Sequence, residues 1–121
     1  PGNAGMFGPG SKAEAGIAGT ISIGGTELPV SGQIDRLAVS DDQVIVCDYK
    51  TNRIVPDNDS RTDPAYLLQM ALYRELLKQI FPGRRIVCRL VWVENGKVSE
   101  PDDSLLDEAL TGIMASVQAY V

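Results

Sequence analysis

The 121-residue sequence contains no histidine and only two cysteines. An ordinary zinc site draws most of its ligands from cysteine and histidine, so the sequence excludes one within this chain. The absence of histidine also excludes any catalysis by this chain alone that depends on a histidine base. Cys47 and Cys88 each lie inside an apolar run, "VIVCDY" and "RIVCRL". We therefore expect two buried, reduced thiols rather than a disulfide.

Long apolar segments and a positive charge balance are also absent. No stretch approaches the roughly 18 apolar residues that a membrane helix needs, and no signal-peptide pattern is present. We therefore expect no membrane partner. The net charge is −5, whereas a protein that binds nucleic acid by itself usually has a basic face. Lys50, Arg53 and Arg61 form a local basic group around one loop, while Arg84, Arg85 and Arg89 are interpreted as solvated surface charges.

Apolar runs and turn residues divide the chain into a short sequence of elements. The Gly/Pro-rich start predicts a linker or disordered end over residues 1–12, with one domain over 13–121 that is cut from a longer protein. Strands are predicted at 13–23, 28–40, 43–50 and 84–94, and helices at 64–80 and from Asp102 or Asp103 to Tyr120. The order β-β-β-α-β-α predicts an α/β (α+β) domain with helices packed on a central sheet.

Two punctuation signals support these boundaries. Asp63 is a suitable N-cap and Pro64 a suitable first residue for the first helix. The polar residues 52–63 before it include Pro56 and predict a loop.

The third strand ends in charged residues, since "VIVCDYKTNR" (44–53) runs from apolar positions into Asp48 and Lys50. Burying an unpaired charge is costly, so these side chains need partners. A hairpin turn centred on Asp41 and Asp42 supplies them on the second strand. It pairs Val39 with Val44, Leu37 with Val46, Asp35 with Asp48, and Gln33 with Lys50.

Asp35 and Asp48 would then face each other with Cβ atoms about 4.5–5.5 Å apart, where like charges are destabilising. A divalent cation such as Mg²⁺, which prefers oxygen ligands, would neutralise them. Lys50 lies on the same face, two residues further on, and would orient a water or stabilise charge on a phosphate. These are the parts for metal-assisted phosphodiester hydrolysis. The spacing alone leaves a plain surface ion-pair cluster open, with Asp35 paired to Arg36 or Arg53 and Lys50 to Asp48.

The helix predicted at 64–80 adds a second polar feature. Its apolar stripe is predicted to consist of Ala65, Leu68, Leu72, Leu76 and Ile80. Gln69 and Tyr73, four residues apart, lie along one edge of that stripe. A glutamine beside a buried seam needs hydrogen-bond partners. Either the pair is half-exposed and satisfied where it stands, or it reaches the end of the sheet near Asp48 and Lys50.

Together, "GQIDRL", "VIVCDYKT" and "YLLQMALY" resemble the RecB-type branch of the PD-(D/E)XK nuclease superfamily, with a restriction-endonuclease-like core and a mixed sheet. The closest resemblance is to the C-terminal nuclease domain of AddA, the helicase–nuclease component of bacterial AddAB complexes. It covers roughly residues 7–95.

The resemblance implies a role for each matching residue. Asp35 and Asp48 look like metal-binding acids, the Tyr49 carbonyl like a further ligand, and Lys50 like the catalytic lysine. Gln69 and Tyr73 match a motif beside the active site and the DNA path. Glu14 falls where many relatives carry a first-strand glutamate, and Arg53 is expected to support DNA binding.

The implied protein is a Mg²⁺-dependent (or Mn²⁺-dependent) exonuclease domain of a double-strand-break repair helicase–nuclease in the bacterial cytoplasm. Its expected partners are single-stranded DNA delivered by the helicase and an AddB-type protein, with ATP used only by the helicase part.

The chain departs from the family pattern in two places. RecB-type nucleases usually carry a metal-binding histidine on a helix upstream of the first strand, and that helix is expected to precede this sequence. The four cysteines of an iron–sulfur cluster are absent too. The alternatives are a non-catalytic nuclease-like module that binds DNA or a partner protein, and another RecB-like exonuclease such as a CRISPR-adaptation nuclease.

Overall fold

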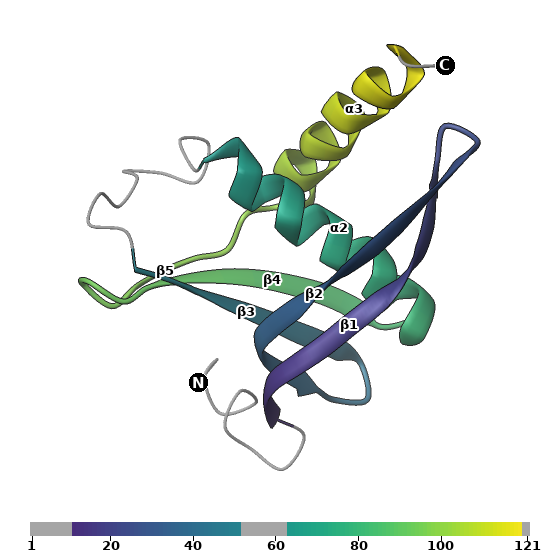
Figure 1. Ribbon diagram of the computed structural model, residues 1–121. Coiled ribbons are helices and arrows are strands. Elements are labelled where there is room, and N and C mark those ends of the chain that lie inside the picture. Colours follow the sequence, from purple (N-terminus) through teal and green to yellow (C-terminus); the bar gives the residue numbers. More distant parts are fainter. Residues whose placement is uncertain (1–10, 52–62, 120–121) are drawn as a thin grey trace.

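The computed structural model describes residues 11–51 and 63–119 of the chain. A five-stranded sheet carries two helices on one side (Figure 1). The strands are β1 (Ser11–Ile23), β2 (Thr26–Val39), β3 (Gln43–Lys50), β4 (Arg85–Trp92) and β5 (Lys97–Ser99), and the helices are α2 (Pro64–Ile80) and α3 (Asp103–Ala119). The strands lie in sequence order, with β3 and β4 parallel and the other neighbours antiparallel. The predicted α/β class with a mixed sheet is therefore confirmed.

The observed elements differ in several places from those expected. The short strand β5 follows the Asn95–Gly96 turn, so the order is β-β-β-α-β-β-α rather than β-β-β-α-β-α. Three residues are too few to produce a recognisable alternation, and β5 is defined by its pairing with β4. The first strand begins at Ser11, inside the predicted linker 1–12. Most of the loop predicted at 52–63, with Arg53 and Arg61, lies outside the described residues, as does Tyr120.

The hairpin between β2 and β3 has the predicted register near its turn. Val39 pairs with Val44 and Leu37 with Val46, because this register directs apolar side chains to the same faces. The ladder ends at Arg36 and Cys47. Gln33 does not face Lys50, as the hairpin predicted. It pairs with Gly16 of β1, because β2 turns away from β3 and continues beside β1 across α2 (Figure 1).

Glycines in the β1–β2 hairpin let α2 pack closely on it. A Cβ atom at Gly32 would lie 2.1 Å from the Tyr73 hydroxyl, and one at Gly19 would lie 2.8 Å from Leu76 Cδ2. A side chain at Gly32 is therefore incompatible with the observed placement of the Tyr73 ring, and one at Gly19 would require the end of the Leu76 side chain to move. The hairpin and helix fit together because two strand positions lack side chains.

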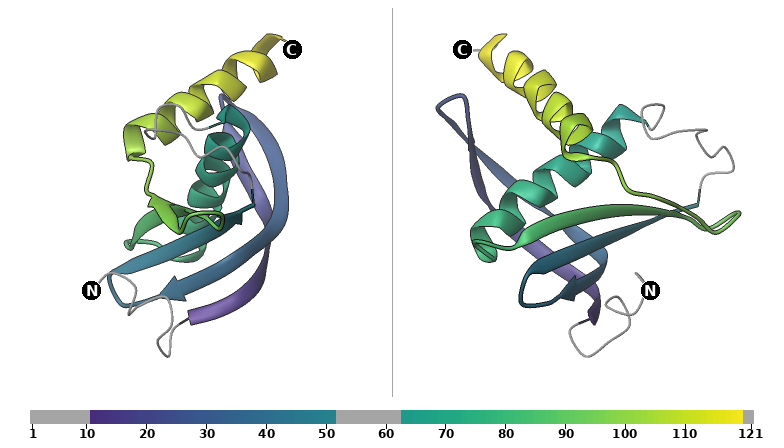
Figure 2. Two further views of the ribbon diagram at one scale, coloured as in Figure 1. Left: turned by 90° about the vertical axis from the view of Figure 1, so that its left-hand side faces the viewer. Right: turned by 180° about the vertical axis from the view of Figure 1, so that it is seen from behind.

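The buried face of α2 shares only Leu76 with the predicted stripe. Ala65 and Ile80 are exposed, and Leu68 and Leu72 are only half-buried. The buried residues are Leu67, Met70, Ala71, Tyr73, Arg74, Leu76 and Leu77. The arc is wide because α2 lies between the sheet and α3, so it packs on two sides (Figure 2). A single apolar stripe describes a helix with one packing partner.

The start of α2 is formed as predicted. Asp63 Oδ1 accepts a hydrogen bond from the Ala65 N–H at 2.9 Å, and Pro64 is the first helical residue. Neither α2 nor α3, the helices of the described part, combines the length and apolarity that crossing a bilayer requires.

Candidate active site

The predicted acidic residues lie where β2 separates from β3. Asp35 follows directly beyond the last rung of their ladder, and its Oδ2 accepts a hydrogen bond from the Tyr49 N–H at 2.8 Å. The Asp35 carboxylate thus takes the place of the backbone acceptor that β2 no longer offers to β3. This bond fixes Asp35 beside the end of β3, next to Asp48.

Asp48 is a buried carboxylate with an exposed fraction of 7%. Burial raises its pKa above the ordinary range, and the interaction with the Asp35 carboxyl raises it further, against the opposing effect of Lys50. Its Oδ2 forms an ion pair with Lys50 Nζ, but accepts no hydrogen bond of regular geometry from the described residues. Asp48 is therefore an under-satisfied buried anion.

Lys50 extends from the end of β3 towards α2. Its Nζ donates to Gln69 Oε1 at 3.3 Å and lies 3.8 Å from the ring centroid of Tyr66. Gln69 Nε2 in turn donates to Tyr73 Oη at 3.4 Å. Tyr73 is buried, with its hydroxyl in the space left by Gly32. A continuous polar path thus runs from Asp35 through Asp48, Lys50 and Gln69 to Tyr73.

The structure decides between the alternatives that the sequence left open. Gln69 reaches Lys50 at the end of the sheet, rather than forming an isolated half-exposed pair with Tyr73. Lys50 does pair with Asp48, as the ion-pair alternative supposed. However, their side chains are only 12% and 10% exposed, so this is a buried cluster rather than a surface one.

The remaining predicted residues relate to this cluster in different ways, and the backbone N–H of Tyr49 is the donor to Asp35 described above. Glu14 is exposed and has a left-handed φ of 54°, unusual for a residue with a side chain. It lies across from Asp35, between the Ala13–Arg36 and Ala15–Ile34 pairs. The Tyr49 side chain is 39% exposed, and the role of its carbonyl as a ligand stays a prediction. Arg53 lies outside the described residues.

Tyr66 and Gly32 belong to the surroundings of the site but were not anticipated. Tyr66 lies three residues before Gln69, a spacing that places both on one side of a helix. That spacing was visible in "YLLQMALY" and was the available signal. Gly32 gave no such signal, because its function depends on a helix 41 positions away in the chain reaching it.

The carboxylate oxygens of this cluster are the type of ligand that a hard divalent cation prefers. Asp35 and Asp48 supply adjacent carboxylate oxygens, and a cation between them would offset the burial and the interaction with Asp35 that raise the pKa of Asp48. Within 11–51 and 63–119, however, no three side chains of the His, Cys, Asp or Glu type come together as a ligand group. The described residues thus provide two carboxylates of a cation site.

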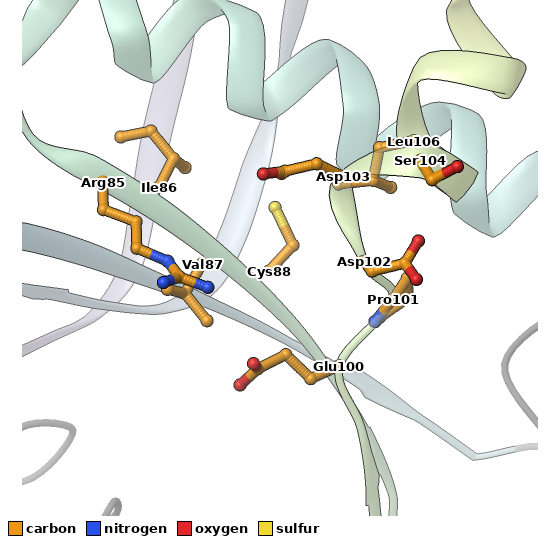
Figure 3. A pocket seen from close by; sticks show the side chains of 10 residues that line it. All are labelled: Arg85, Ile86, Val87, Cys88, Glu100, Pro101, Asp102, Asp103, Ser104 and Leu106. Atoms are coloured by element: carbon orange, nitrogen blue, oxygen red, sulfur yellow. The ribbon is translucent and has the colours of Figure 1, made fainter.

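A hollow of about 380 Å³ lies away from this cluster, between β4 and the start of α3 (Figure 3). Its charged lining consists of Glu100, Asp102 and Asp103 against Arg85 alone. An excess of carboxylates repels a phosphate backbone, so this hollow does not suit DNA.

Neither Cys47 nor Cys88 forms a disulfide, as expected, and both are buried. Burial raises the pKa of Cys47 to about 11 and that of Cys88 to about 12. Both thiols therefore remain protonated near neutral pH, so neither is an activated nucleophile there.

Comparisons with known proteins agree with this geometry. A family model described as the PD-(D/E)XK nuclease superfamily matches residues 7–115. An ATP-dependent helicase/nuclease component from Streptococcus suis (strain 98HAH33) is 32% identical over 72 residues, which span 60% of this chain and 6% of that protein. The crystal structure of SSO0001 superposes with a TM-score of 0.51 at 17% identity, covering 97% of this chain and 54% of that one. At 17% identity, the match to SSO0001 supports only a similarity of fold.

Proposed function

We propose, because this chain belongs to the PD-(D/E)XK nuclease superfamily, that its Asp35–Asp48–Lys50 cluster hydrolyses phosphodiester bonds of DNA with a divalent cation. The observation that carries the proposal is the buried Asp48, an under-satisfied anion in contact with both a second carboxylate and a lysine. Perturbed ionisable groups of this kind are typical of functional sites.

Each residue has a distinct part in the proposed reaction. Asp35 and Asp48 hold Mg²⁺, with Mn²⁺ as a substitute and the Tyr49 carbonyl as a further ligand. When bound, such a cation lowers the pKa of a coordinated water and neutralises charge on the scissile phosphate. Lys50 directs its ammonium group at the attacked phosphate, where positive charge stabilises the transition state. Gln69 accepts from Lys50 Nζ and so holds the lysine at the end of the sheet.

The biological setting is proposed from the streptococcal relative. Its name combines a helicase with a nuclease, and the aligned part of this chain corresponds to a small share of its length. We extend this to an exonuclease domain of a double-strand-break repair helicase–nuclease in the bacterial cytoplasm. Single-stranded DNA would be supplied by an ATP-driven helicase part, and an AddB-type protein would be the partner.

The test compares cleavage of end-labelled single-stranded DNA by the wild type, Lys50→Met and Asp48→Asn, with Mg²⁺ or Mn²⁺ and with chelator. We expect each substitution to reduce the rate constant for cleavage by roughly 10²–10⁴-fold, the range typical of removing a catalytic group. Arg89→Met is the matched control, because Arg89 pairs with Glu100 away from the cluster. Cation-dependent cleavage by Lys50→Met at the wild-type rate would refute the assignment.

A non-catalytic module that binds DNA or a partner protein is the second candidate. It is favoured by one observation, since the described residues do not assemble three acidic or other ligating side chains. Calorimetric titration with Mn²⁺ separates the two candidates. Heat of binding that Asp48→Asn abolishes supports the nuclease, whereas DNA binding without cation binding or cleavage supports the module.

A further inference from the structure

The ammonium group of Lys50 is surrounded by three protein groups. A lysine has three N–H donors and no acceptor. In this site Asp48 Oδ2 and Gln69 Oε1 face two of the available directions, and the ring of Tyr66 lies 3.8 Å from Nζ. A cation at this distance from a ring is attracted by the negative charge density of the ring face. The charge on Lys50 is therefore held from the α2 side by an amide and by an aromatic ring.

From this contact we infer that Tyr66 is a positioning residue, whose ring face holds the Lys50 ammonium group in its working place. The inference rests on the proposed function for the role of Lys50. The inference goes beyond that function because it gives Tyr66 a role, and that role depends on the aromatic ring and not on the hydroxyl group.

The ring of Tyr66 is itself supported from behind. Its centroid lies 6.2 Å from that of Trp92, with an angle of 51° between the planes, an arrangement that aromatic pairs favour. Trp92 is 1% exposed and its Nε1 donates to Ser99 Oγ at 3.2 Å. The short strand β5, which carries Ser99, thus anchors Trp92, and Trp92 supports Tyr66.

The sheet register places these groups at one level. Lys50 and Trp92 are direct partners in the parallel ladder between β3 and β4. Partners across a ladder point to the same face, so the lysine and the indole both rise towards α2. Tyr66 comes down from α2 onto the two of them, and this explains how one ring contacts both.

The ring contact serves a purpose that Gln69 cannot serve alone. A lysine side chain has four methylene groups and many rotamers, so a single hydrogen bond fixes its end only loosely. The reaction also requires Lys50 to exchange its contact with Asp48 for one with the phosphate. The attraction of an ammonium group to a ring face does not depend on the direction of its N–H bonds. The Tyr66 ring can therefore hold the Lys50 ammonium group while its hydrogen-bond partners change. Correct placement within a fraction of an ångström strongly affects rate.

The test compares Tyr66→Phe, which keeps the ring, with Tyr66→Leu, which keeps apolar bulk without a ring. Leu68→Ala is the matched control on the same helix, because Leu68 lines the groove between α2 and α3 and not the site. In the 121-residue protein without metal, the Lys50 Hε resonances should be shifted upfield by the ring current. We expect that shift in the wild type, Tyr66→Phe and Leu68→Ala, and its loss in Tyr66→Leu.

Cleavage kinetics provide the second readout. Tyr66→Leu should lower kcat by roughly 3- to 30-fold, the range that a partly desolvated cation–π contact supports, with KM for DNA little changed. Tyr66→Phe and Leu68→Ala should retain kcat. An effect in Tyr66→Phe equal to that in Tyr66→Leu would assign the role to the hydroxyl and overturn the inference. Unshifted Lys50 resonances in the folded wild type would overturn it as well.

The two readouts separate failure of this inference from failure of the proposed function. If the wild type cuts no DNA with any cation, the proposed function fails, and the resonance comparison still decides whether Tyr66 holds Lys50. If the wild type cuts DNA and Tyr66→Leu cuts it with the same kcat, the proposed function stands and Tyr66 has no positioning role.

Discussion

The described part of the chain has two clusters of buried charge, one at Lys50 and one at Arg74, and they are balanced in opposite ways. Arg74 is 2% exposed and contacts Glu75, Asp103 and Asp107, whose side chains remain 31%, 77% and 67% exposed. These three carboxylates remain in contact with water while they neutralise the buried guanidinium group of Arg74. At the other cluster the carboxylate of Asp48 is buried with Lys50, and one of its oxygens lacks a regular hydrogen bond.

The pKa values follow this difference. Burial alone lowers the pKa of Arg74, but the hydrogen bond with Asp107 and the charges of Glu75 and Asp103 outweigh it and leave the pKa raised. The charged form of Arg74 is therefore favoured by its surroundings. The raised pKa of Asp48 means that its charged form is disfavoured. The Arg74 cluster is electrostatically satisfied and connects α2 with α3. The Asp48 cluster would be stabilised by a further positive charge.

The largest effect on folding should come from Arg74→Met. The substitution removes hydrogen bonds to three carboxylates and leaves these like charges close together, so we expect the free energy of unfolding to fall by roughly 2 kcal/mol after discounting for solvent. Urea denaturation followed by circular dichroism measures it. Lys78→Met is the control, because Lys78 also pairs with Glu75 but is 54% exposed. Equal losses in both variants would mean that burial of Arg74 contributes nothing.

A smaller effect of opposite sign is expected for Asp48→Asn in the absence of metal. Because its folded-state pKa is raised, the contribution of Asp48 to stability is greatest at acid pH and declines as pH rises through that pKa. Asparagine does not titrate, so the variant should be more stable than the wild type by about 1 kcal/mol at neutral pH, with the gain vanishing towards pH 4. Unfolding curves across this pH range measure it.

The matched change in the other cluster is Asp107→Asn, which should destabilise, because Asp107 accepts from Arg74 Nη2 at 2.6 Å. If both asparagine variants change stability in the same direction, the contrast between the clusters does not hold.

The smallest expected effect concerns one thiol near each cluster. Besides burial, the pKa of Cys47 responds to Arg89, Arg36 and Asp48, and that of Cys88 responds first to Arg74. With a pKa of about 11, roughly one Cys47 thiol in a thousand is ionised at pH 8. Neither cysteine should react with iodoacetamide at pH 8 until the protein unfolds, as read by mass spectrometry.

The direction in which the two thiols change stability with pH also follows from their raised pKa values. Their contribution to stability is complete below about pH 9 and is lost as pH rises towards 11 and 12. Rapid modification of either native thiol at pH 8 would show that its cluster opens on its own.

Local patterns predicted the four longer strands, the N-cap at Asp63 and the hairpin register near its turn, because each depends on residues close together in the chain. The site was predicted in part for the same reason. Asp35, Asp48 and Lys50 are placed by one hairpin, and Gln69 was identified by its spacing on a helix. Their catalytic roles stay predictions.

What the sequence did not disclose depends on distant segments. Arg74 is buried where α3 packs on α2, and this second packing partner also explains the incorrect stripe on α2. Tyr66 gained its contact only because α2 crosses above Lys50 and Trp92. Contacts between distant segments produce no periodic pattern in the sequence, so they become visible only in the folded structure.

The separation of β2 from β3 at Asp35 has a consequence for how this domain tolerates change. The position of Asp35 relative to Asp48 is set by the length of chain that turns at Asp41 and Asp42. Substitutions at the two exposed turn positions leave that length unaltered. Insertion of one residue there would shift the ladder by one step and direct Asp35 to the opposite side of the sheet. The turn is thus free to vary in sequence but constrained in length.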